Sequence, residues 1–318
     1  MSIICMESFH LIRCGEMNVY SKVLVCFTLC GALLLSGCDK NDGESSRITE
    51  IVVSDFSSDT ENNDFPINLC GEKIEKAVEK AVSLSPAATE IICELGLEDK
   101  LVGTSSYCDY PDGLSLPRLG SSENPDIDGI IMLAPDAVFT VSALAERDSY
   151  VLEQAGIAVI KLGIPVSIDG YAELYSDISA AFYGNAYDGG IKKAEKIGEE
   201  AKEKLCHASE KVRLGSFLYI TEKFTAAGTN TFESAVLSLS GGNLCVKDGY
   251  ISVEELKDIQ PDSLIIDNKL NEDDIMGNEF LSKLAENSSV YYVDRQFFER
   301  PSYRTVKVFE QIRVSEML

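Results

Sequence analysis

Hydrophobic positions divide this chain into three consecutive regions. An unbroken apolar run, VLVCFTLCGALLL, covers residues 23–35 and ends at the small residues that precede Cys38. A polar stretch follows over residues 39–65, and beyond Pro66 short apolar runs alternate with helical patterns. The first run has thirteen residues, too few to span a bilayer comfortably, and matches the apolar part of a signal peptide.

The small residues before Cys38 predict that this cysteine is the lipidated first residue of the mature protein. Residues 1–16 carry acids and two cysteines where a short basic segment should stand, so we predict that translation starts at Met17. Residues 1–37 are then the signal peptide, and residues 38–65 a flexible tether. A short transmembrane anchor is the alternative. The prediction places the protein outside the cytoplasm, anchored by lipid to the cell membrane.

Beyond Pro66, strand-type runs such as DAVFTV and DSLIID alternate with helical patterns. Such alternation predicts an α/β fold with mainly parallel sheets. Residues 127–139 and 253–265 echo each other, since each reads as a helix, a turn containing proline, and an apolar strand. Ser85-Pro86 and Thr231 are expected to begin helices at matching places. The sequence therefore predicts two similar lobes.

We predict an N-terminal lobe over residues 66–187 and a C-terminal lobe over residues 212–318, bridged by one long, charged, rigid helix over residues 188–211. Open α/β sheets bind ligands at the carboxyl ends of their strands, so a ligand cleft is expected between the lobes. No phosphate-binding loop of the GxGxxG or GxxxxGK[ST] type is present, which argues against nucleotide enzymes.

The formal charge of −24 and the isoelectric point near 4.4 argue against nucleic acid as a partner, because phosphate binding needs lysine and arginine. A cationic docking partner fits this charge, and a well-solvated acidic surface is the simpler alternative.

The number and spacing of histidine and cysteine residues argue against a metal site and against a catalytic centre. After processing, His207 is the only histidine, inside a charged helical stretch that indicates a surface position. Five cysteines remain, without CxxC spacing, and an odd number cannot pair fully within one chain: Cys70, Cys93, Cys108, Cys206 and Cys245. A hydrolase using Asp109 or Asp128 would need a nucleophile–base pair, and no supported spacing exists. We expect no enzyme activity, no metal site and no cofactor.

Two segments carry a resemblance to a known family: SLSPAATEIICELGLEDKLVGTSSYCDYP over residues 83–111 and FFERPSYR over residues 297–304. From about Pro66 to its end the chain resembles the substrate-binding proteins of ABC importers that take cobalamin, siderophores or haem, in which one rigid helix bridges two lobes. The resemblance is nearest to the cobalamin-binding members, whose versions also run Ser-Ser-Tyr-x-Asp-Tyr-Pro and Phe-Glu-Arg.

The resemblance implies two principal ligand-binding residues. Tyr107 matches a tyrosine that lies against the corrin ring, and a tyrosine offers a flat apolar face with a polar tip. Arg300 matches an arginine that faces the cleft, where its donors can reach amides or a phosphate. The alternatives are that Tyr107 packs a loop and that Arg300 pairs with Glu299 or Glu310. Further candidates for the cleft lining are Tyr110, Phe139, Phe224, Phe297 and Phe298.

Two departures from the family pattern bear on the ligand. Cobalamin-binding relatives commonly place tryptophans around the corrin and an aspartate before the Phe-Glu-Arg segment. This chain has no tryptophan, and Gln296 stands in place of that aspartate. Another corrinoid, haem or a ferric siderophore is therefore an alternative ligand.

The resemblance also implies docking contacts. Glu90 matches a glutamate that engages arginines of the permease, and Glu94 lies one helical turn further on, where a cationic partner would relieve the repulsion between them. The alternative is that Glu90 only favours a helix N-terminus. On the second lobe Glu233 is a weaker match. We thus expect a monomeric receptor that captures a corrinoid and delivers it to an ABC permease, with a sensory lipoprotein of the same fold as the alternative.

Overall fold

The computed structural model describes residues 64–185 and 187–315, without the side chains of residues 187 and 188. These residues belong to one compact unit, Asp59–Leu318. The predicted signal peptide, Met17, Cys38 and almost all of the predicted tether lie outside the described residues. Of the helices in the described part, none combines the length and the apolar character needed to cross a membrane.

The first sheet is fully parallel, as the alternating pattern predicts, with strand order β4-β3-β5-β6. Its strands are β3 (Ala81–Ser83), β4 (Leu101–Thr104), β5 (Ala137–Thr140) and β6 (Ala158–Lys161). The connecting helices are α1 (Pro86–Glu94), the 3₁₀ turn η1 (Glu98–Lys100), α2 (Ile127–Leu133) and α3 (Glu146–Gln154). An antiparallel pair, β1 (Ile67–Leu69) and β2 (Glu72–Ile74), precedes them.

Helix starts in this lobe follow the predicted chemistry. The Ser85 hydroxyl accepts a hydrogen bond from the backbone N–H of Ala88 (3.3 Å), and Pro86 occupies the first helical position of α1. Asp126 caps α2 in the same way through the N–H of Gly129 (3.0 Å). These caps fix where α1 and α2 begin, and therefore how they leave the sheet.

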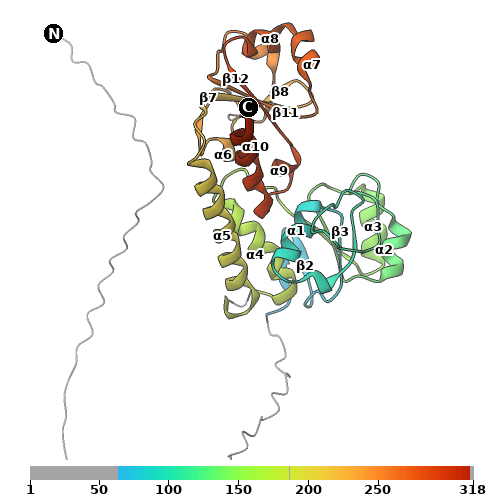
Figure 1. Cartoon of the computed structure of the whole chain (residues 1–318). Coiled ribbons are helices and arrows are strands. Elements are labelled where there is room, and N and C mark those ends of the chain that lie inside the picture. Colours follow the sequence, from blue (N-terminus) through green and yellow to red (C-terminus); the bar gives the residue numbers. More distant parts are fainter. Residues whose placement is uncertain (1–63, 186, 316–318) are drawn as a thin grey trace, which may run out of the picture. The chain divides into compact units, whose positions relative to one another are not determined.

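Two helices connect the first sheet to the second. They are α4 (Gly170–Tyr183) and α5 (Lys192–Ser209), with the short π-helical segment η2 (Tyr187–Ile191) between them. Figure 1 shows α4 and α5 lying side by side. A Cβ atom at Gly198 would lie 2.9 Å from the Cα atom of Ala172, so glycine is required for this close approach.

The second sheet is mixed, with strand order β10-β8-β7-β11-β12 and β9 paired to β7. Its strands are β7 (Gly215–Ile220), β8 (Thr225–Ala227), β9 (Gly241–Asn243), β10 (Tyr250–Ser252), β11 (Ser263–Asp267) and β12 (Ser289–Val293). Strands β7, β9, β11 and β12 are parallel, whereas β8 runs antiparallel to both of its neighbours, β7 and β10. Its helical elements are α6 (Phe232–Leu237), η3 (Val253–Leu256), α7 (Glu272–Gly277), α8 (Glu279–Ala285), α9 (Gln296–Glu299), η4 (Tyr303–Val306) and α10 (Lys307–Ser315).

The predicted echo between the lobes is present at the level of topology. Helix α2 leads into β5 in the first sheet, and η3 leads into β11 in the second. The element that corresponds to α2 in the second lobe, η3, is a 3₁₀ turn and not an α-helix. Thr231 caps α6 by accepting from the N–H of Ser234 (3.2 Å), as predicted.

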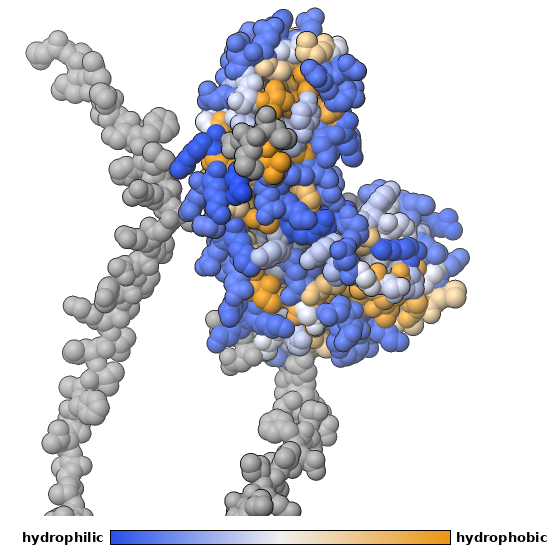
Figure 2. All heavy atoms as spheres, in the orientation of Figure 1, coloured by the Kyte–Doolittle hydropathy of each residue, from blue (hydrophilic) through white to orange (hydrophobic). Residues whose placement is uncertain are grey.

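One continuous hydrophobic core joins the two lobes. It includes residues of both sheets together with α4, α5 and α10. Two smaller cores lie on other sheet faces, one beneath α2 and α3 and one beneath α7 and α8. The face of the molecule in Figure 2 is mostly hydrophilic, in keeping with the strong acidic balance of the chain. Both lobes therefore pack against the same helices, α4, α5 and α10, and are not separated by a flexible linker.

Phe139 belongs to this core and does not line the cleft. It lies on the central strand β5 and is completely buried, with its ring stacked on that of Phe182 at 5.7 Å between centroids. The expectation that Phe139 contacts the ligand is not met, because β5 has neighbours on both sides and all four of its residues are buried.

Replacing Phe139 with alanine should lower the free energy of unfolding by about 3–5 kcal/mol, since it removes a fully buried ring from a packed core. Chemical denaturation of the full chain measures this loss. Tyr150→Ala is the control, because Tyr150 is exposed and its loss should change stability by about 0.5 kcal/mol or less. A loss below about 1 kcal/mol for Phe139→Ala would contradict its core position.

Candidate functional site

A cavity of about 720 Å³ lies between the two sheets and is lined by residues of both lobes. On the first lobe its lining comes from the segments that follow β3, β4, β5 and β6. On the second lobe, Lys269 follows β11 and Arg295 follows β12, while residues 230–233 lead into α6. The carboxyl ends of parallel strands thus face this space from both sides, and its volume falls in the usual range of ligand pockets.

Part of the lining is apolar or aromatic. Tyr107 lies in the loop after β4 with 67% of its surface exposed, whereas Phe298 on α9 is almost fully buried. The Phe298 ring packs against the ring of Tyr219 at 5.0 Å between centroids. Val141, Ile164 and Phe232 add apolar surface. The cavity therefore offers one exposed ring and a wall of packed hydrophobic side chains.

The predicted ligand residues fall into different places. Tyr107, Phe298 and Arg300 all line the cavity. Phe297 is buried and lies beside another cavity next to α10, and Phe224 packs half-buried against the core beneath α7 and α8. The structure thus brings three of the seven candidates together at the cavity.

Arg300 also takes part in an ion cluster that joins the lobes, formed by Glu90, Asp109, Arg300, Ser302 and Arg304. Its Nη1 lies 3.4 Å from Glu90 Oε1 and donates to Asp109, and its Nη2 donates to the Tyr107 carbonyl oxygen (3.1 Å). Arg304 Nη1 donates to Glu90 Oε1 (2.8 Å), and the Ser302 hydroxyl donates to Glu90 Oε2. Arg300 therefore does not pair with Glu299 or Glu310.

The position of Glu90 differs from the expected one. Only 1% of its surface is exposed, because α1 turns this side chain toward the second lobe. A carboxylate that docks onto another protein must be accessible, and in this structure Glu90 is not. Spacing along α1 correctly put Glu90 and Glu94 on one face, but it did not reveal that the second lobe covers this face. Glu233 is 5% exposed and lines the cavity, so it is not presented for docking either.

Glu94 lies beside this cluster and contacts the second lobe through the backbone N–H of Tyr303 (3.2 Å). The Tyr175 hydroxyl also donates to it. Burial raises the pKa of Glu94 to about 7, and the negative charge of Glu90 adds to this effect against the two hydrogen bonds. Burial likewise raises the pKa of Glu90, opposed by Ser302 and Arg304.

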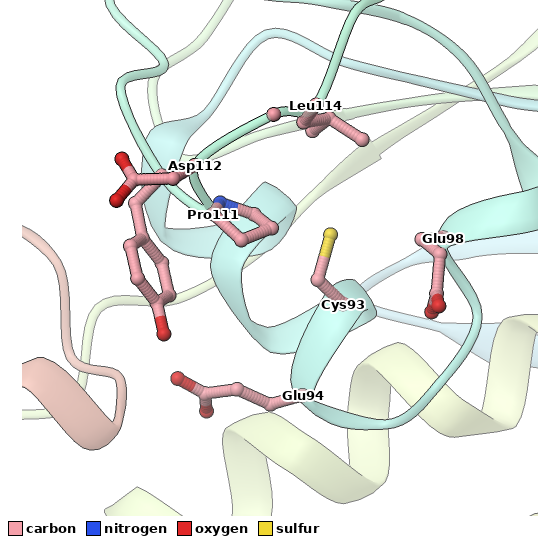
Figure 3. Close-up of a pocket in the computed structure, with 8 residues that line it drawn as sticks. Cys93, Glu94, Glu98, Pro111, Asp112 and Leu114 are labelled. Atoms are coloured by element: carbon pink, nitrogen blue, oxygen red, sulfur yellow. The ribbon is translucent and has the colours of Figure 1, made fainter.

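A second cavity, of about 430 Å³, borders Glu94 on the first lobe. Figure 3 shows Cys93 and Glu94 at the end of α1, with Pro111, Asp112 and Leu114 of the loop after β4 across from them. Tyr110 lines this second cavity, and the guanidinium of Arg304 lies 4.8 Å from its ring centroid. Tyr110 is therefore placed next to the ion cluster and does not line the large cavity, and its contact with a ligand stays a prediction.

Several polar residues of the large cavity were not predicted from the sequence: Glu123, Tyr250, Lys269, Arg295 and Glu299. A signal existed for Arg295 and Glu299, which follow the last strand: Arg295 lies two residues before the FFER segment, and Glu299 belongs to it. The five cysteines of the described region are free thiols. Among the described residues, no group of histidine, cysteine, aspartate and glutamate could hold a metal ion.

A family model of periplasmic binding proteins matches residues 82–296. The chain belongs to this family. Among curated relatives, it is 25% identical over 310 residues to the uncharacterized ABC transporter substrate-binding lipoprotein YvrC of Bacillus subtilis, covering 90% of this chain and 94% of YvrC. It is 27% identical over 251 residues to the vitamin B12-binding protein of Vibrio parahaemolyticus, covering 74% of this chain and 88% of that protein.

Solved structures of this family share the fold. The periplasmic vitamin B12 binding protein BtuF of Vibrio cholerae matches with a TM-score of 0.56 and 23% identity, covering 76% of this chain and 99% of BtuF. The periplasmic heme binding protein HutB of Vibrio cholerae matches with a TM-score of 0.62 and 19% identity, covering 75% of this chain and 98% of HutB. The resemblance seen in the sequence is confirmed, and the protein is an extracytoplasmic substrate-binding protein of an ABC transporter.

Replacing Glu90 with glutamine should lower the free energy of unfolding by about 3 kcal/mol, since two arginines lose their shared buried anion. Urea denaturation of the full chain measures the change. Glu98→Gln is the control, because Glu98 is exposed at the start of η1 and makes no ion pair within the described residues. Equal stability of the two variants would show that the ion cluster does not hold the lobes.

The raised pKa of Glu94 predicts a loss of stability as pH rises. A folded-state pKa above the unfolded value favours the protonated form, so the contribution is complete below pH 4.5 and disappears as pH passes 7. We expect the wild type to lose on the order of 2 kcal/mol of unfolding free energy between pH 5 and pH 8 relative to Glu94→Gln. Denaturation curves across this range measure it, and parallel pH profiles would contradict the assignment.

Proposed function

We propose that this substrate-binding protein captures cobalamin or a related corrinoid between its lobes and delivers it to an ABC permease. The observation that carries this proposal is the joint position of Tyr107 and Arg300 in the lining of the large cavity. These are the two residues for which the family resemblance implies contact with a corrinoid.

The physical properties of the lining support a large, partly apolar ligand. The exposed ring of Tyr107 can lie flat against a macrocycle, while Phe298 and the aliphatic residues of the first lobe form a packed wall. Arg300 supplies donors for the polar edge of such a ligand, and the hydroxyl oxygen of Tyr250 can accept a hydrogen bond from it. Affinity would come from burial between preformed walls, with a few polar groups that fix orientation.

The relatives support the same ligand. Several curated proteins similar to this chain are named vitamin B12-binding proteins, among them those of Vibrio parahaemolyticus and Vibrio cholerae. Their identities of 26–27% lie in a range where ligand preference can differ, so their names motivate the proposal and the cavity lining gives it residues.

The proposal includes the location and partners of the protein. A lipid on Cys38 would hold the monomeric receptor at the membrane, and a cationic surface of the permease would meet its acidic exterior. Because Glu90 and Glu233 are buried, exposed carboxylates elsewhere would make that contact. No chemical step is required of the receptor.

Haem capture is the second candidate, and one feature favours it. Tyr107 and Tyr250 both line the cavity and are 67% and 48% exposed, and a tyrosine phenolate can act as an axial ligand of haem iron. The absorption spectrum of the protein mixed with ferric haem would reveal such a bond.

Titration of the full chain, purified in mild detergent, with cyanocobalamin should show one site in the nanomolar to micromolar range. Tyr107→Ala should weaken binding about tenfold or more, because a stacked ring contributes on the order of 1–2 kcal/mol. Tyr150→Ala, at an exposed tyrosine on α3, is the control and should bind as the wild type. No heat and no coloured complex, together with a tyrosine–iron haem spectrum, would replace the corrinoid with haem.

A further inference from the structure

The basic side chains of the large cavity are already paired with acids of the chain itself. Lys269 Nζ lies 2.8 Å from Glu222, and Arg295 Nε lies 3.0 Å from Glu299. Arg300 belongs to the ion cluster with Glu90 and Asp109. A ligand carboxylate that enters the cavity would therefore compete with existing anions for each of these three cations.

Glu233 differs from the other acids of the second-lobe wall. It is 5% exposed, lies in the first turn of α6, and has no basic side chain within ion-pair distance among the described residues. Its Oε1 accepts a hydrogen bond from the Tyr250 hydroxyl (2.7 Å), and both residues line the cavity. One oxygen is held by Tyr250, and the described residues offer no partner for the other.

Two polar atoms in the interior of the second lobe lack hydrogen-bond partners among the described residues. The Tyr219 hydroxyl on β7 and Asp267 Oδ2 at the end of β11 are completely buried, and neither has a hydrogen-bond partner among the described residues. Burial raises the pKa of Tyr219, and the charges of Asp267 and Glu233 add to this effect. Buried polar groups are normally hydrogen-bonded, so Tyr219 and Asp267 leave two unsatisfied polar atoms in the interior behind the cavity lining, to which neither residue belongs.

We propose that Glu233, oriented by Tyr250, accepts a hydrogen bond from a carboxamide NH₂ on the edge of the ligand and thereby selects amide-bearing corrinoids over carboxylate-bearing ones. The inference rests on the proposed function, since a corrinoid carries amides around its ring. An amide donates to the open oxygen of Glu233. A carboxylate at the same place would put two like charges together in a site whose cations are already neutralised.

The proposed selection can be measured as the ratio of the affinities for an amide-bearing and a carboxylate-bearing ligand. A site built to accept a hydrogen bond rejects a ligand that lacks the donor far more strongly than it rejects a change of size, because the buried acceptor is then left unpaired. Glutamine at position 233 keeps the shape but can both donate and accept. It should therefore bind a carboxylate about as well as an amide.

The test compares cyanocobalamin with its monocarboxylic acids, prepared by mild hydrolysis of single peripheral propionamides and separated as isomers. The wild-type full chain should bind at least one isomer about tenfold or more weakly than cyanocobalamin. In Glu233→Gln this ratio should fall to about threefold or less. Glu255→Gln removes an exposed carboxylate that pairs with Lys247 away from the cavity, and it should keep the wild-type ratio.

Tyr250→Phe provides a second variant that keeps the charge of Glu233 and loses only its orienting hydrogen bond, so it should give an intermediate ratio. Retention of the full ratio in Glu233→Gln, or equal binding of all isomers by the wild type, would overturn this inference while leaving corrinoid capture in place. Failure of the wild type to bind cyanocobalamin itself would overturn both.

Discussion

The arrangement of the lobes depends on one buried charge, the carboxylate of Glu90. A carboxylate that is 99% buried is costly unless it is paired and hydrogen-bonded, and Arg300, Arg304 and Ser302 of the second lobe meet both needs. Because the charge sits on the first lobe and its partners on the second, the lobes cannot separate at this point without exposing or stranding ions. The ion cluster therefore limits how far the cavity can open on this side.

The helix pair gives the second constraint. Helices α4 and α5 approach closely through Gly198, and their buried side chains belong to the same core as both sheets. With the core and the ion cluster acting together, the cavity walls are largely preformed. Ligand binding then costs little free energy for rearrangement of the lobes. Release of the ligand requires that the cavity be opened by a partner, and an ABC permease can do this. Arg300 takes part in both the ion cluster and the cavity lining, so a ligand that draws on its donors also acts on the contact between the lobes.

Sequence reasoning reached the fold and part of the site, and the difference has a physical cause. Alternation of strand and helix patterns predicted the parallel first sheet, and the caps at Ser85 and Thr231 depend only on nearby atoms. Tyr107 and Arg300, which line the large cavity, were predicted through motifs that resemble the family. The burial of Phe139 and Glu90 was not predicted, because their environment is set by segments distant in sequence. Helical spacing gives the direction of a side chain, but only tertiary packing decides whether solvent or another lobe lies there.

The acidic character of the whole chain is also seen in the lining of the large cavity. The whole chain has an excess of acids. At the cavity, the three basic side chains already have anionic partners, whereas the lining residues Glu123 and Glu233 have no basic side chain within ion-pair distance among the described residues. Such a lining is poorly suited to a multiply charged anion and well suited to a neutral ligand rich in amide donors. Because the chain has no tryptophan, no indole ring can stack on the face of a macrocyclic ligand. Under the proposed capture of a corrinoid, hydrogen bonds to the polar edge from Glu233 and its neighbours on the second lobe would therefore contribute more to selectivity than stacking.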